Sequence, residues 1–170
     1  MKKFIIAFLL ISLSIIGFAQ KNKGTVPKDR LMTLISEYSG KDGFDVVKIG
    51  SIGTSAMKTV LNLSAAKEND EDARKMAELM KGIKKMAIVD YDSCNSGTRD
   101  TFNAKLEKIL DSSELLMEMK DGDDIMKIYG IVDKDGTTLH DFVMYAPQDC
   151  ALICMFGSIP METVMKIAEK

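Results

Sequence analysis

The sequence is poor in the residues that most often carry chemistry. His140 is the only histidine, and the cysteines are limited to Cys94, Cys150 and Cys154. There is no Gly-x-Ser-x-Gly elbow, no phosphate-binding loop and no dinucleotide-binding glycine motif. No motif names a reaction, and the sequence therefore favours a protein that is not an enzyme and has no cofactor.

The single histidine gives little support for acid–base catalysis. A Ser-His-Asp arrangement would need a serine and an aspartate close to His140. Its neighbour Asp141 is expected on the opposite face of a strand, because side chains alternate along strands. The nearby Asp133–Gly136 segment is explained by a hairpin turn. We therefore interpret His140 as a surface or interface histidine.

The three cysteines leave two interpretations open. Cys150 and Cys154 fall on one face of a predicted strand, about 13 Å apart at roughly 3.3 Å per residue. A disulfide needs Cα atoms within about 7 Å, so this pair is not expected to bridge or to share a metal. Cys94, in a predicted loop, could pair with either in an oxidising compartment. The interpretation that we favour is that Cys150 and Cys154 are small buried apolar residues.

Methionine is unusually common, with 13 residues in the chain. Thioethers bind the soft cuprous ion, and Met117 with Met119, or Met76 with Met80, has a suitable spacing. However, no Met-x-x-Met run or histidine cluster completes a ligand set. The same spacings place each pair on one face of a strand or helix. We therefore expect these side chains in the core or on an adaptable binding surface, and we expect no metal site.

The N-terminus has the pattern of an export signal. Lys2 and Lys3 precede an apolar stretch at 4–16, and small residues lead to a cleavage site after Ala19. The apolar stretch is shorter than the roughly 20 residues of a membrane span and has no stop-transfer pattern. We predict a protein of the periplasm or cell envelope without a stable membrane span after signal removal. A retained N-terminal anchor is the alternative. No cysteine follows the signal, so no lipid anchor is expected.

Charge and length limit the partners and the number of domains. Signal removal takes the 23 basic residues to 21, against 25 acidic residues. The basic residues form no stripe, so we do not expect a nucleic-acid partner. Residues 20–27 are predicted to be a flexible leader, and residues 28–170 a single domain.

The hydrophobic pattern predicts an α+β fold. Four strands at 114–120, 124–132, 137–146 and 150–156, separated by tight turns, favour an antiparallel meander. Upstream, strands are predicted at 45–49 and 83–91. Amphipathic helices are predicted at 28–38, 55–65, 71–81, 100–111 and 160–169. The expected architecture is a mostly antiparallel sheet of about six strands covered by amphipathic helices.

A dispersed set of segments carries a family resemblance. The segments are Tyr38-Ser39-Gly40, 46–49, 114–121, Ile128-Tyr129, 142–144 and 153–159. With these segments the chain resembles the bacterial family named domain of unknown function 4252, over about the whole mature chain. The resemblance implies a small exported or envelope-associated α+β domain and carries no known catalytic residues. Many members have a lipid-anchoring cysteine after the signal, which this chain lacks.

These observations lead to two hypotheses for function. The first is a non-enzymatic exported envelope protein that binds a protein partner or a small apolar ligand through its methionine-rich interior. The alternative is a periplasmic metal-handling or thiol-redox protein that uses Cys94, Met117 and Met119.

Overall fold

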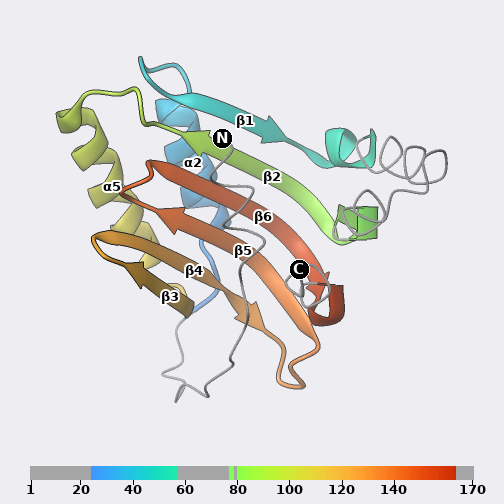
Figure 1. Cartoon of the computed structure of the whole chain (residues 1–170). Helices are drawn as coiled ribbons and strands as arrows, with labels where there is room; N and C mark the ends of the chain where they lie inside the picture. The colour runs from blue at the N-terminus through green and yellow to red at the C-terminus, as the bar shows by residue number, and fades with distance from the viewer. Residues whose placement is uncertain (1–23, 57–76, 79, 164–170) are drawn as a thin grey trace, which may run out of the picture.

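A single antiparallel sheet organises the structure. The computed structural model describes residues 24–56, 77–78 and 80–163, and within them six strands pair in the order β1-β2-β6-β5-β4-β3 (Figure 1). Along the chain the elements are α2 (Lys28–Tyr38), β1 (Asp45–Ile49), β2 (Ile83–Asp90), α5 (Ser96–Leu110), β3 (Leu115–Asp121), β4 (Asp124–Val132), β5 (Thr138–Ala146) and β6 (Ala151–Pro160). The predicted α+β fold and its C-terminal four-stranded meander are confirmed.

Element boundaries differ from the sequence prediction at a few places. Helix α5 begins at Ser96 because the Asn95 side chain accepts the Thr98 N–H at 2.9 Å and caps the helix. Strand β6 continues to Pro160, where a helix was predicted to begin. Of the helices predicted at 55–65, 71–81 and 160–169, the greater part lies outside the described residues.

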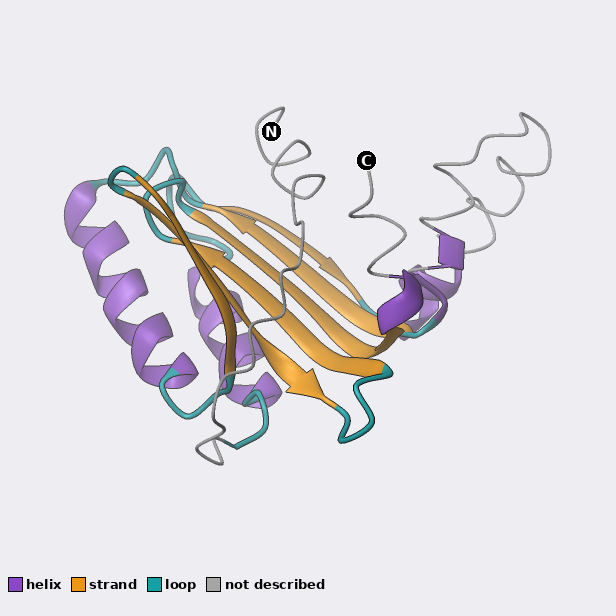
Figure 2. Ribbon diagram, turned by 60° about the horizontal axis from the view of Figure 1, so that its bottom comes forward, coloured by secondary structure: helices purple, strands orange, loops and turns teal. Residues whose placement is uncertain are grey.

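One face of the sheet is covered by α2 and α5 (Figure 2). Four rings, those of Tyr38, Phe44, Tyr91 and Phe102, pack with centroids 4.8 to 5.6 Å apart. Such tilted and edge-to-face contacts stabilise a core beyond simple burial. The helix-side core consists of Val26, Leu31, Leu34, Ile35, Tyr38, Phe44, Ala87, Val89, Tyr91, Cys94, Phe102, Leu106, Ile109, Leu110, Tyr129, Val143, Tyr145, Cys150, Leu152, Cys154 and Phe156.

The opposite face is apolar across its whole width. One row of cross-strand partners runs through all the described strands: Val47, Ile88, Ile153, Met144, Ile128 and Met117. We call this side the methionine face. Its buried cluster contains Met80, Ile83, Ile128, Leu139, Phe142, Met144, Met155 and Ile159, with Met86, Leu116, Met117, Met126, Val132, Ile153 and Met161 packed against it. The sheet therefore has two apolar sides, of which α2 and α5 cover one.

Register shifts cross the sheet from β2 to β3 in a continuous line. One extra residue stands at Lys84 in β2, at the Phe156–Gly157 step in β6, at Asp141 in β5 and at Leu116 in β3. We call this the bulge line. A bulge bends its strand and turns neighbouring side chains to new directions. The alternation rule therefore fails along this line.

The bulge in β3 corrects the predicted alternation of that strand. Leu115 pairs with Tyr129 and faces the helix side, whereas Leu116 and Met117 both pack against the methionine face. Met119 pairs with Met126 and keeps to the same side as Met117. Strict alternation along 114–120 would place Leu115 on the same face as Met117 and Met119, and the bulge at Leu116 prevents this.

The described end of the predicted leader is part of the packed structure. Val26 is buried in the helix-side core, and Gly24 forms a β-bridge with Ser113. Burial of an apolar side chain stabilises this segment against the sheet. The described residues 24–27 of the predicted leader therefore contact the folded domain.

Candidate functional site

A pocket of about 300 Å³ opens over the bulge line on the helix side of the sheet. Strands β2, β5 and β6 supply most of its wall, and Lys28 enters from the first turn of α2. The lining residues are Lys28, Ser51, Lys84, Lys85, His140, Asp141, Phe156, Gly157 and Ser158. Most of the lining residues are thus polar or charged, and the pocket lies where the strand geometry is least regular.

The bulges explain how consecutive residues line one pocket. In a regular strand Lys84 and Lys85 would point to opposite faces, as would His140 and Asp141. The register shifts at Lys84 and Asp141 remove this alternation, and both members of each pair line the pocket. The prediction that Asp141 lies on the opposite face from His140 is therefore wrong.

Asp141 is held in an unusual backbone conformation by two polar contacts. Its φ is +54°, in the left-handed region that residues other than glycine rarely adopt, and the residue is buried. One carboxylate oxygen accepts the Gly157 N–H at 3.1 Å, and the other lies 2.8 Å from the Lys28 ammonium. These contacts join the start of α2 to β5 and β6, and they neutralise the carboxylate.

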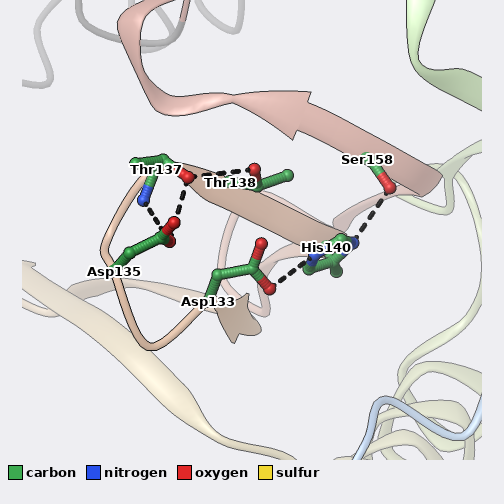
Figure 3. Close-up of polar contacts among 6 residues, drawn as sticks. All are labelled: Asp133, Asp135, Thr137, Thr138, His140 and Ser158. Atoms are coloured by element: carbon green, nitrogen blue, oxygen red, sulfur yellow. Dashed lines mark hydrogen bonds and ion pairs between the residues drawn. The ribbon is translucent and has the colours of Figure 1, made fainter.

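His140 lies between a serine and an aspartate (Figure 3). Its Nδ1 is 2.9 Å from the Ser158 Oγ, and its Nε2 is 2.8 Å from the Asp133 Oδ1. His140 and Ser158 are direct cross-strand partners, and Asp133 follows the end of β4. The sequence prediction missed this row of hydrogen-bonded side chains for two reasons. Ser158 is distant from His140 in sequence, and Asp133 was assigned to the hairpin turn alone.

The chain Ser158–His140–Asp133 has the contacts of a nucleophile, a base and an orienting acid. Acyl transfer also needs free N–H donors beside the serine to stabilise an oxyanion. The Ser158 N–H instead donates to the Gly82 carbonyl at 3.1 Å, and the Gly157 N–H donates to Asp141. With both of these groups engaged, the arrangement is better suited to holding a polar ligand than to attacking one.

The charge of the pocket is positive. Lys28 is paired with Asp141, whereas Lys84 and Lys85 have no carboxylate within 4.0 Å among the described residues. Of the charged groups that line the pocket, three lysines therefore face one aspartate. The excess of two positive charges is a feature that an anion would recognise.

The cysteines all lie in the helix-side core as free, buried thiols. Burial raises the pKa of the Cys154 thiol to about 12, and burial also raises the pKa of Cys150. Cys150 precedes β6 with a φ of +54°, so the predicted strand start at this residue is one position early. A disulfide from Cys94 stays a prediction.

Two further predictions concern metal ligands and the signal. Within 24–56, 77–78 and 80–163, no group of three or more His, Cys, Asp or Glu side chains is placed to hold a metal ion. The cleavage site after Ala19 and the possible ligand Met76 lie outside the described residues. Met117 packs against the methionine face, while Cys94 lies in the helix-side core. The structure does not bring these two side chains of the redox or metal hypothesis together.

The lysines, Ser158 and the bulges were not anticipated from the sequence. Two features of the sequence could have indicated them. One is the adjacent pair Lys84-Lys85 in the largely apolar strand β2, and the other is the Gly157-Ser158 step inside β6. A glycine within a strand indicates a bulge or a close backbone approach. A Cβ atom at Gly82 would stand 1.5 Å from the Ser158 carbonyl oxygen, so this position requires glycine.

Comparison with known proteins identifies the family. No curated protein and no solved structure matches the chain. In the described part of the chain, no helix is both long and apolar enough to cross a membrane. The family model described as a domain of unknown function, DUF4252, matches residues 38–167, which include every strand and all but Lys28 of the pocket lining. The chain therefore belongs to the DUF4252 family.

Proposed function

We propose that this is an exported, non-enzymatic protein of the cell envelope that binds a protein partner at the β1 end of its methionine face. The observation that carries this proposal is the exposure of apolar side chains there. Val47 is 53% exposed and Ile88 is 37% exposed, although Met144 in the same cross-strand row is 1% exposed. Ile52, just beyond β1, is 89% exposed. Grouped exposed apolar residues are typical of protein contact surfaces.

The position of β1 favours a protein over a small apolar ligand. β1 is an edge strand, so one side of its backbone is not paired within the described sheet. Such an edge can accept an extended segment of another protein, while neighbouring apolar side chains contact its residues. At the other edge, β3 carries the charged residues Glu118, Lys120 and Asp121, which discourage edge-to-edge association. β1 also has a charged residue near each end, but its centre is the apolar pair Val46-Val47.

Site-specific photo-crosslinking tests this proposal. A photoreactive amino acid at Val47 should capture one defined partner in cells, and the same group at Leu115 should not. Leu115 is a matched control because it is 40% exposed at the opposite edge and on the helix side. The substitution Ile88→Ser should abolish capture from position 47. Equal capture from both positions, or capture unaffected by Ile88→Ser, would overturn the proposal.

Two measurements separate the remaining parts of the proposal. Fractionation of cells, followed by N-terminal sequencing, should place the protein in the envelope with Gln20 as its first residue. Retention in the cytoplasm would contradict export. Sedimentation of the purified protein should show a monomer. A dimer that dissociates on Ile88→Ser would identify the partner as a second copy of this chain and would contradict the proposal that a different protein binds here.

A further inference from the structure

We propose that the pocket over the bulge line binds a phosphate-type dianion, held by Lys84 and Lys85 together with Ser158. This site lies on the helix side of the sheet, whereas the proposed partner surface lies on the methionine face. The inference therefore does not depend on the proposed function.

The excess of positive charge in the pocket favours a doubly charged anion as the ligand. Lys28 already forms an ion pair with Asp141, so the positive excess resides at Lys84 and Lys85. A phosphate monoester carries about −1.5 to −2 charges near pH 7, which matches this excess. Lysine is a common phosphate ligand that acts as a point charge, and two lysines facing one pocket attract a dianion more strongly than a singly charged carboxylate.

The backbone around the pocket is irregular in a way that serves this arrangement. Asp141 is held at a φ of +54°, and Gly157 has a φ of +147°. Residues in sparsely populated backbone conformations are strained and gather at ligand-binding positions. Here the irregular geometry has a definite result, because it turns both adjacent lysines to the pocket that Ser158 also lines.

The protonation state of His140 determines whether the Ser158 hydroxyl can donate a hydrogen bond to an anion. When the imidazole is neutral and donates from Nε2 to Asp133, its Nδ1 accepts the Ser158 hydroxyl proton. When the imidazole is protonated, both nitrogens donate, and the Ser158 hydroxyl is released to donate into the pocket. Anion binding is therefore coupled to proton uptake at His140.

Other charged groups around the pocket act on the same equilibrium. The charged groups that face His140 are Asp133, whose Oδ1 lies 2.8 Å from Nε2, and the pocket residues Asp141, Lys28, Lys84 and Lys85. A bound dianion offsets the lysine charges. It therefore favours the imidazolium form of His140, and protonation in turn favours the anion.

Nuclear magnetic resonance of His140 provides a direct test, because this is the only histidine of the chain. The protein, as the exporting cells process it and without a histidine tag, is titrated with sulfate. Sulfate remains a dianion over the working range, so any pH dependence reports the protein. We expect saturable binding that is about fivefold or more tighter at pH 5.5 than at pH 7.5, within the usual range of coupling between sites. Absence of saturable binding would overturn the proposal.

Substitutions test which residues carry the binding. The double variant Lys84→Gln with Lys85→Gln should bind sulfate about tenfold or more weakly, which corresponds to the loss of a charge-assisted contact. The matched control, Lys108→Gln with Lys120→Gln, has the same net charge and lies outside the pocket lining. An equal loss in the control would show a general charge effect and would refute a specific site.

His140→Gln tests the proton coupling separately. Glutamine retains a donor and an acceptor but does not titrate. Sulfate should therefore still bind to this variant, with the same affinity at pH 5.5 and pH 7.5. A pH dependence that persists in His140→Gln would contradict the role given to His140.

The source of the phosphoryl group is distinguished with two probes. Soluble glycerol phosphate is compared with phosphatidylcholine vesicles containing phosphatidic acid, each with wild type and with the Lys84→Gln, Lys85→Gln double variant. Lysine-dependent binding of the soluble probe supports a free metabolite, and lysine-dependent binding of the vesicles alone supports a lipid headgroup. Lysine-independent binding of both would overturn the site. Ile88→Ser should bind either probe like the wild type, so failure of the proposed partner surface is recognised independently.

Discussion

The two faces of the sheet are both apolar, yet they are built from different residues. All four tyrosines and all three cysteines of the chain lie in the helix-side core. The methionine face instead draws methionines from several strands and from helical residues beyond them. Aromatic rings are rigid and fix one packing arrangement, whereas methionine is flexible and fits irregular or changing partners. The helix side is therefore suited to stability and the methionine face to binding.

Side chains on the helix side are also more completely buried than those at the β1 end of the methionine face. The helix-side core includes large rings that are almost fully buried, such as Tyr38 at 1% and Phe102 at 0% exposure. Along one row of the methionine face, exposure rises from 1% at Met144 to 53% at Val47. This gradient leads toward the edge strand β1. The comparison predicts unequal responses to substitution on the two sides.

The largest expected effect is at the centre of the helix-side core. Phe102→Ala should lower the free energy of unfolding by about 3–5 kcal/mol, because Phe102 contacts the rings of Tyr38, Phe44 and Tyr91. Urea denaturation measures the change. Ile88→Ala is the control on the methionine face and should cost less than half as much. Equal losses would remove the distinction between the two sides.

The bulge line should be the next most sensitive region. Gly157→Ala should destabilise the protein by about 2–3 kcal/mol, since an alanine there would combine a strained φ with a backbone clash. An added Cβ atom would stand 2.2 Å from the Gly82 carbonyl oxygen. Gly122→Ala separates the two causes, because its φ is +60° but its Cβ would meet no atom within 4 Å. This control should cost about 1 kcal/mol; a cost as large as that of Gly157→Ala would assign the effect to strain alone.

Alkaline pH should act mainly through the helix-side core. Burial raises the pKa of Cys154 from 9.0 to about 12 and that of Tyr129 from 10.0 to about 12. Both groups stay neutral in the folded protein while they ionise in the unfolded chain. Their contribution is therefore complete below about pH 9 and is lost as the pH rises toward 12, by up to about 1.4 kcal/mol per pH unit for each group. The methionine-face cluster contains no such group.

Denaturation in urea at a series of pH values from 8 to 11 measures this loss. Cys154→Ala should show a shallower decline than wild type above pH 9, because one of the two groups is removed. A decline of unchanged slope would mean that the thiol does not contribute. It would then leave the tyrosines as the source of the alkaline sensitivity.

The smallest effect on stability is expected at the edge of the methionine face. Ile88→Ser should lower the free energy of unfolding by only about 1 kcal/mol, because Ile88 is already partly exposed to water. The same substitution is expected to abolish partner capture. A large loss of stability would indicate that this end of the face belongs to the core, and the comparison between the two sides would have to be redrawn.

Prediction from the sequence succeeded where the signal was local. The helix at Lys28–Tyr38 and the strand at Asp45–Ile49 have the predicted bounds, because apolar spacing and flanking turn residues define them. The Asp133–Gly136 turn also forms as expected, with the Gly136 N–H donating to the Asp133 carbonyl. The start of α5 was placed too late, since the capping role of Asn95 was not recognised.

The sequence by itself determined the apolar faces of the helices and strands, the hairpin turns and the family resemblance. These properties depend on residues a few positions apart, whose spacing can be read along the chain. Only the tertiary structure decided the pairing of β2 with β6, the line of bulges and the pocket that joins Lys84, His140 and Ser158. A bulge shifts the register by one residue and reverses which side chains share a face. Its position depends on contacts between strands far apart in sequence, so alternation along one strand does not reveal it.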